Sequence, residues 1–151
     1  MVNLEQLKKL RDVTSASISD CRLALEETSG DYKKALEWLR VHGLEKAAKK
    51  ENRTTSQGLV ESYIHQKGRI GAMVEILCET DFVARTTEFK NLAHEIAMQV
   101  ASMNPKDVKS LLKQEYIRDS SKSIEGLIKE TIAKLGENIV VKKLQRFEIG
   151  E

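Results

Sequence analysis

The chain has 151 residues, of which 40% are hydrophobic and 32% are charged. That length allows one ordinary domain, or a small domain beside a medium one, and the composition excludes a disordered chain. The formal net charge is only +2, from 25 basic and 23 acidic residues. Because the two signs mostly alternate along the chain, a dedicated nucleic-acid binder is disfavoured. The densest basic run is typical of a solvated helix end: Lys46, Lys49, Lys50 and Arg53.

Cysteine usage and hydropathy indicate a compartment. Cys21 and Cys78 lie far apart and lack metal-ligand spacing, which favours a reducing environment. No apolar run approaches the roughly 20 residues that span a bilayer. The segment 1–5 resembles neither a signal peptide nor a transit peptide. We therefore expect a cytoplasmic protein with no membrane partner.

The first third of the chain predicts three short helices. Leucines recur at helical spacing over residues 4–13. Ser17 and Asp20 have capping-box spacing and predict the start of a second helix. After Gly30, Asp31 predicts the cap of a third helix, which we expect to end at Gly43 and to be followed by a polar helix up to residue 51.

This pattern resembles a three-helix bundle of the ubiquitin-associated type. We expect residues 1–51 to form a docking domain of that kind. Such modules bind partners through the loop between their first two helices, which here is Thr14–Ile18. Ile18 is the one bulky apolar residue of that loop. The sequence leaves open whether Ile18 packs into the core or contacts a partner.

The rest of the chain, residues 52–151, predicts an α+β core domain. Residues 52–58 have the polar composition of a linker. Strands are expected at 59–64 and 70–78, joined by a glycine-containing turn at 66–69. The second strand carries apolar residues on both of its faces, which favours burial on both faces for part of its length.

Three helices and a last strand complete the predicted core domain. The most regular amphipathic helix opens at Thr87 and Glu88. Asn104 and Pro105 predict the N-cap and first residue of a shorter helix that reaches Ile117. A last helix is expected from Ser121 or Ser123 to Gly136, before a strand at 139–149. The fold class is therefore α+β: an N-terminal three-helix ubiquitin-associated-like bundle, followed by a small three-stranded antiparallel sheet packed with helices.

Three motifs resemble a known family in their order and over nearly the whole chain. The first comprises Asp20–Leu25, Gly30-Asp31 and Ala35–Arg40. The second is Cys78-Glu79-Thr80-Asp81-Phe82-Val83-Ala84-Arg85. The third comprises Gly136-Glu137-Asn138-Ile139 and Arg146-Phe147-Glu148. Together these motifs are similar to the signatures of elongation factor Ts.

The resemblance implies guanine-nucleotide exchange on elongation factor Tu, a GTPase that holds GDP through a phosphate loop and Mg²⁺. It assigns the intrusion near that metal site to Asp81 and Phe82, the first as an acidic competitor and the second as an aromatic wedge. The segment starts at Thr80; Val83 and Ala84 would pack beneath it, and Arg85 would pair at its rim. The residues alone also fit Phe82 as a core residue and Asp81 as an ordinary N-cap.

Two departures from the family pattern concern docking and assembly. Residues 14–19 read Thr-Ser-Ala-Ser-Ile-Ser where the family usually has Thr-Gly-Ala-Gly-Met-Met. The docking residues we expect are Leu10, Arg11, Thr14 and Ile18. The chain also has room for only one core subdomain, whereas longer relatives carry two and an additional coiled-coil hairpin. Similar short members pair as homodimers, so we expect a homodimer to which the strand at 139–149 contributes.

Exchange performs no covalent chemistry, so no catalytic residue, cofactor or metal is expected. The sequence has no glycine-rich phosphate loop, and His42, His65 and His94 lack metal-ligand spacing. A non-catalytic adaptor with a ubiquitin-associated-like module is the main alternative function. A hydrolase that uses Cys78, His94 and Asp81 is disfavoured, because Cys78 lies in an apolar strand that would not lower its pKa.

Overall fold

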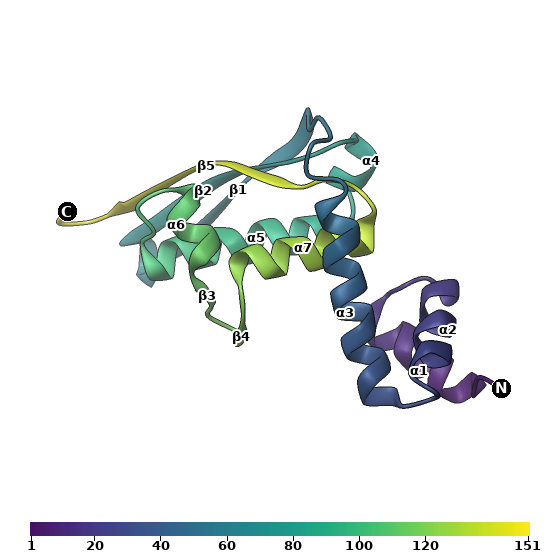
Figure 1. Cartoon of the computed structure of the whole chain (residues 1–151). Helices are drawn as coiled ribbons and strands as arrows, with labels where there is room; N and C mark the ends of the chain where they lie inside the picture. Colours follow the sequence, from purple (N-terminus) through teal and green to yellow (C-terminus); the bar gives the residue numbers. More distant parts are fainter.

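The N-terminal part of the chain folds into three helices, drawn in purple and dark blue in Figure 1. The computed structural model describes residues 1–151 and places α1 at Leu4–Thr14, α2 at Ile18–Glu27 and α3 at Tyr32–Ala48. Ser17 and Asp31 cap α2 and α3 through their side-chain oxygens, as predicted. The three helices enclose a small cluster of buried residues: Leu10, Cys21, Ala24, Leu25, Ala35 and Leu39.

Helix α3 continues straight through Gly43, so the predicted helix end there is wrong. A Cβ atom at Gly43 would lie 3.2 Å from Cβ of Ala133 on α7 (Ile124–Leu135). The glycine therefore permits a close approach of two helices and does not terminate α3. The last turns of α3 pack beside α7 (Figure 1), and Ala47 belongs to the core of the C-terminal part. One helix is thus shared by both parts of the molecule.

The C-terminal part is built on the predicted three-stranded antiparallel sheet. Its strands are β1 (Gln57–His65), β2 (Ile70–Cys78) and β5 (Val140–Glu148), in the order β1-β2-β5. A single 3-10 turn at Gln66–Gly68 joins β1 to β2, and β2 pairs with β5 over most of its length. The sheet places the end of β2 close to the start of β5, because Leu77 is the register partner of Val140.

Helices cover one face of this sheet and leave the other face open. Helices α5 (Thr87–Met103) and α7 pack on one side of the strands (Figure 1). Alternate residues of β2, from Ala72 to Cys78, point into the resulting core of 19 buried residues. On the opposite face Met73 is 49% exposed. Glu75 and Leu77 of that face are half-buried, so the expected burial on both faces of part of β2 is only partial.

The segment between α5 and α7 differs most from the prediction. Asn104 does not cap a new helix; it ends α5 in the left-handed conformation with φ of 45°, which asparagine tolerates. Asp107 is the N-cap of α6 (Val108–Lys113). The chain then forms a hairpin, β3 (Glu115–Tyr116) and β4 (Asp119–Ser123), with Ile117 in its turn.

Buried Gln99 of α5 explains why this hairpin forms. Its side-chain nitrogen donates to the carbonyl of Glu115 at 3.0 Å, and its oxygen accepts from the N–H of Ile117 at 3.1 Å. Ser123 then caps α7, which Gly136 ends with φ of 77°, so that Ser123 and not Ser121 starts the last helix. None of these helices combines the length and the apolar character needed to cross a membrane.

Candidate partner-binding site

The segment Thr80–Arg85 forms a single exposed helical turn at the end of β2. Thr80 is the N-cap of α4 (Asp81–Ala84), and its hydroxyl accepts from the N–H of Val83 at 3.3 Å. Thr86 is in turn the N-cap of α5. Two threonine caps six residues apart therefore confine the chain to one turn between a strand and a long helix. Figure 1 shows α4 at one corner of the core, beyond the edge of the helical layer.

Phe82 projects from this turn. Its residue is 77% exposed, whereas Val83 and Ala84 are half-buried and pack against the core. The alternative that Phe82 is a core residue is therefore wrong. A rigid aromatic ring kept in water by such a short element is available for insertion into a partner.

Asp81 and Arg85 form an ion pair on the same turn. Nη2 of Arg85 lies 3.0 Å from Oδ2 of Asp81, and both side chains are largely exposed. Asp81 is the first residue of α4 and Thr80 is its cap, so the alternative of Asp81 as an N-cap is also wrong. An exposed pair of this kind contributes about 1 kcal/mol or less. A partner can therefore separate the two charges at small cost.

Residues from the far end of the chain hold the base of α4. Glu137, directly after α7, accepts from the N–H of Thr80 at 2.9 Å and from its hydroxyl at 2.7 Å. Asn138 donates its backbone N–H to Glu79 at 2.8 Å. Neither residue was predicted to take part in the site. The only available signal was the Gly136–Ile139 motif, which marks the family but not the contact.

The thiol of Cys78 is structural. It is fully buried and donates to the carbonyl of Thr80 at 3.1 Å. Burial, with the nearby carboxylate of Glu137, raises the pKa of Cys78 above its usual value. His94 lies instead beside Glu61, 3.9 Å away, and a protonated thiol is a poor nucleophile. The structure also contains no cluster of three His, Cys, Asp or Glu side chains that could hold a metal ion.

The N-terminal docking residues do not share one environment. Ile18 is 53% exposed, so of the two alternatives for this residue core packing is excluded. Arg11 is exposed, and Thr14 is half-buried, with its hydroxyl donating to the carbonyl of Leu10 at 2.6 Å. Leu10 itself is completely buried. It supports this surface from beneath and is not available for direct contact.

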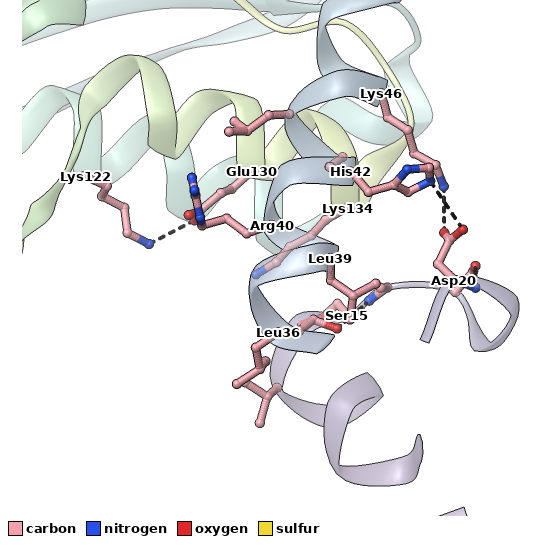
Figure 2. A pocket seen from close by; sticks show the side chains of 17 residues that line it. Ser15, Asp20, Leu36, Leu39, Arg40, His42, Lys46, Lys122, Glu130 and Lys134 are labelled. Atoms are coloured by element: carbon pink, nitrogen blue, oxygen red, sulfur yellow. Dashed lines mark hydrogen bonds and ion pairs between the residues drawn. The ribbon is translucent and has the colours of Figure 1, made fainter. Parts of the chain in front are cut away.

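A cavity of about 570 Å³ separates the docking loop from the core (Figure 2). Lys122 and Glu130 lie on its core side, 2.9 Å apart. On the side of the N-terminal module, which comprises α1, α2 and α3, Asp20 accepts from Nζ of Lys46 at 2.6 Å. The first basic residue of the predicted solvated helix end is thus paired within the module. The cavity leaves the loop that contains Ser15 standing apart from α7.

The uncovered face of the sheet presents exposed apolar side chains. Ile64, Met73 and Phe147 lie around Gly71 at the turn end of the strands, and Ile64 and Phe147 are register partners of Gly71. Ile64 and Phe147 are 65% and 66% exposed. A Cβ atom at Gly71 would lie 2.9 Å from Cδ1 of Ile64, so glycine allows Ile64 to cover the strand.

Comparison with known proteins agrees with the motifs on this scaffold. The family model described as "Elongation factor TS" matches residues 79–151. The chain is 42% identical to elongation factor Ts of Thermoanaerobacter sp. (strain X514), with 100% of this chain and 96% of the relative aligned. It is also 42% identical to elongation factor Ts of Coprothermobacter proteolyticus, with 99% of each chain aligned. The chloroplastic elongation factor Ts of Guillardia theta is 42% identical over 99% of this chain and 90% of the relative.

The alignments also show that this chain is the shorter partner. The alignment with the Thermoanaerobacter relative has 196 positions and includes all 151 residues of this chain, a difference of 45 positions. The relatives therefore carry residues with no counterpart here, while the α4 segment and the residues that hold its base are retained within the matched range. The chain belongs to the elongation factor Ts family, whose members are translation elongation factors.

Proposed function

We propose that this chain is a guanine-nucleotide exchange factor that promotes release of GDP from elongation factor Tu. The observation that supports this most directly is the 77% exposure of Phe82 on a turn whose base is hydrogen-bonded to the core. A side chain of this kind is ready to enter an apolar groove without first leaving one of its own. The family membership supplies the reaction for which such a wedge is suited.

The exchange is a matter of differential binding and involves no covalent step. A factor that binds the nucleotide-free GTPase more tightly than its GDP complex accelerates GDP loss by thermodynamic linkage. Each factor of ten requires about 1.4 kcal/mol of that difference. Burial of the ring of Phe82 in the nucleotide-free partner supplies on the order of 2 kcal/mol.

Asp81 and Arg85 add an electrostatic contribution. When their exposed ion pair opens, the carboxylate of Asp81 approaches the Mg²⁺ site of the partner and competes for the polar groups that hold the metal. The guanidinium of Arg85 then pairs with the rim of the partner's groove. This rearrangement is accessible because the pair is solvent-screened.

The N-terminal module provides affinity and not exchange. Arg11, Thr14 and Ile18 form the docking surface, with Leu10 beneath them, and the cavity keeps this surface clear of α7. Ile18→Ala, which leaves α3 and its contacts with the core in place, would therefore be expected to raise the concentration needed for half-maximal exchange more than it lowers the maximal rate. An unchanged half-maximal concentration would remove the docking role.

Release of fluorescent GDP from purified elongation factor Tu tests the proposal. The wild-type chain at micromolar concentration is expected to accelerate release, and Phe82→Ala to lose most of that acceleration with an unchanged circular dichroism spectrum. Ile117→Ala, an exposed apolar residue in the β3–β4 turn away from α4 (Figure 1), is the matched control and is expected to match the wild type. Binding without any acceleration would instead favour the adaptor alternative.

We also propose that the open face of the sheet pairs two copies of the chain. The exposed side chains of Ile64, Met73 and Phe147 are the support for this assembly, since apolar patches of this kind commonly mark interfaces. Met73→Lys is expected to convert a dimer into a monomer in light-scattering measurements. Met103→Lys, at an equally exposed methionine near the end of α5 and outside the open face, is the matched control. A wild-type chain that is monomeric at high micromolar concentration would contradict the assembly.

A further inference from the structure

The carboxylate of Glu137 is the only side chain that bonds both donors of Thr80. Its two oxygens accept from the backbone N–H at 2.9 Å and from the hydroxyl at 2.7 Å. Thr80 and Glu137 are 57 residues apart, and both are half-buried. A two-point contact fixes direction as well as distance. The residue that begins α4 is therefore held in one orientation by a residue outside it.

Helix α4 is too short to hold that orientation by itself. It has four residues, and a single turn is far below the length at which a helix is stable in water. The hydroxyl of Thr80 also accepts from the N–H of Val83, so the same atom joins the cap of α4 to Glu137. If this contact were lost, the cap would lose its support and Phe82 would sample many directions.

A second contact beside the first connects this junction to the N-terminal module. Asn138 is 4% exposed, and its side-chain nitrogen donates to the carbonyl of Arg53 at 3.0 Å and to that of Glu51 at 3.3 Å. Its backbone N–H donates to Glu79, which also lies 3.7 Å from Nη1 of Arg53. The chain that leaves α3 is therefore tied to Asn138, the residue next to the one that holds Thr80.

We propose that Glu137 is a positioning residue for nucleotide exchange: it holds Thr80 so that Phe82 is presented in one direction, at a fixed distance from the N-terminal module that Asn138 anchors. This inference rests on the proposed function. Glu137 does not contact the partner; it acts through Thr80 and Phe82. Because Phe82 is already held in one direction in the folded protein, little conformational entropy has to be lost when the partner binds.

The first test separates rate from affinity. Glu137→Ala is expected to lower the maximal rate of GDP release at saturating exchange factor by about tenfold, as for a misplaced reacting group. The half-saturating concentration is expected to change by less than about threefold, since the docking surface is intact. Glu137→Gln keeps an acceptor for the N–H of Thr80 and is expected to recover part of the rate. Glu125→Ala removes an exposed carboxylate of α7 and serves as the matched control.

A double substitution distinguishes positioning from general destabilisation. If Glu137 acts through Phe82, then adding Glu137→Ala to Phe82→Ala is expected to lower the maximal rate by less than about twofold beyond Phe82→Ala alone. Fully multiplicative losses would overturn the inference. So would a loss in Glu137→Ala that appears only in the half-saturating concentration.

Hydrogen exchange tests the contact without the partner. Amides of residues 80–86 are expected to exchange at least tenfold faster in Glu137→Ala than in the wild type, while those of α5 keep their protection. Equal protection of residues 80–86 in both proteins would show that Glu137 does not hold the segment. If the wild-type chain fails to accelerate GDP release but the local exchange behaves as expected, the proposed function fails and the contact stands.

Discussion

The N-terminal module and the C-terminal core differ in how much of their structure they stabilise by themselves. Six buried residues form the centre of the module, and 19 form the centre of the core. A cluster of six is marginal for an independent domain. The module gains support because α3 extends into the core, where Ala47 is buried and Gly43 lies against Ala133.

The two parts also differ in the reach of their polar contacts. In the module the ion pairs of Arg22 with Glu26 and of Arg40 with Glu37 are local and exposed, and the most distant side-chain bond joins Lys46 to Asp20, 26 residues away. In the core, Glu137 and Asn138 bond to groups that lie 57 and 59 residues away. The longest-range contacts therefore hold the base of α4, whereas the N-terminal module is supported by one shared helix.

The largest effects are expected when a buried side chain at the centre of each part is truncated in turn. Phe89→Ala removes a completely buried ring from the core and is expected to cost about 3–5 kcal/mol of unfolding free energy. Leu25→Ala in the module is expected to cost about 2–5 kcal/mol, but in a region that can open without the core. Trp38 is the single tryptophan and packs on the module's cluster, so its fluorescence reports the module alone.

The measurement is chemical unfolding followed by fluorescence and by far-ultraviolet circular dichroism. In Leu25→Ala the fluorescence transition is expected to precede the dichroism transition, whereas in Phe89→Ala both are expected to move together. Coincident transitions in Leu25→Ala would show that the two parts unfold as one unit.

A substitution at Gly43 tests the attachment itself. Gly43→Leu forces a large side chain between α3 and α7 and is expected to destabilise the module by about 1–3 kcal/mol, measured by the Trp38 transition. Gly43→Ala is the control, because its Cβ would meet Ala133 at 3.2 Å while alanine favours the helix by up to about 1 kcal/mol. A smaller effect of leucine than of alanine would contradict the close packing of the two helices.

Residue patterns correctly predicted the helix ends that are determined by residues at those ends. Ser17, Asp31 and Gly136 mark helix ends by their own side chains or by the lack of one, and the structure confirms all three. The role of Gly43 was predicted wrongly, because the residue that favours a glycine there is Ala133, which lies 90 residues further along the chain. The β3–β4 hairpin was missed because it depends on buried Gln99, and a glutamine inside an apolar helix gives no sign of its partners.

The residues of the candidate site likewise divide into those that could be predicted from local patterns and those that depend on distant contacts. The exposure of Phe82 and the packing of Val83 followed from the motif, and the structure confirms both. The role of Glu137 could not be predicted, because nothing in its own neighbourhood distinguishes a carboxylate that reaches Thr80 from a solvated one. Leu10, by contrast, lies within the apolar repeat of α1, and that repeat by itself favours the burial that the structure shows.

A smaller effect is expected in the docking loop. Ser15 ends α1 in the left-handed conformation, with φ of 56°, where a side chain carries a steric cost. Ser15→Gly is therefore expected to stabilise the module by about 0.5–1 kcal/mol in Trp38-detected thermal unfolding. Ser19→Gly, the same change inside α2, is expected to destabilise it by a similar amount. Equal signs for the two substitutions would show that backbone conformation is not the cause.

The smallest expected effect is a difference between the module and the core in how their stability depends on pH. Partial burial pushes the pKa of Asp20 upward, but hydrogen bonds with Lys46 and Ser17 and the charges of Lys46 and His42 outweigh it, so the pKa lies below its ordinary value. Since the folded pKa is lower than the unfolded one, the stabilisation is present above about pH 4 and is lost as the pH falls through the folded pKa. Asp20→Asn is expected to lower the Trp38 unfolding midpoint at pH 7, by an amount equivalent to about 1 kcal/mol or less of unfolding free energy, and this difference is expected to shrink as the pH falls below about 4.

The midpoint is the right quantity for this comparison, because it does not depend on the emission intensity of Trp38, on which His42 stacks. The core provides an internal control in the opposite direction. Burial and the hydrogen bond to Glu95 raise the pKa of Tyr116 to about 12. A tyrosine that stays protonated in the folded state stabilises it below about pH 10 and loses that effect as the pH rises toward 12. Acid is therefore expected to weaken the Asp20–Lys46 contact of the module, whereas alkali is expected to weaken the Tyr116–Glu95 contact of the core. A wild-type advantage over Asp20→Asn of the same size at every pH from 7 down into the acid range would show that Asp20 acts through its shape and not through its charge.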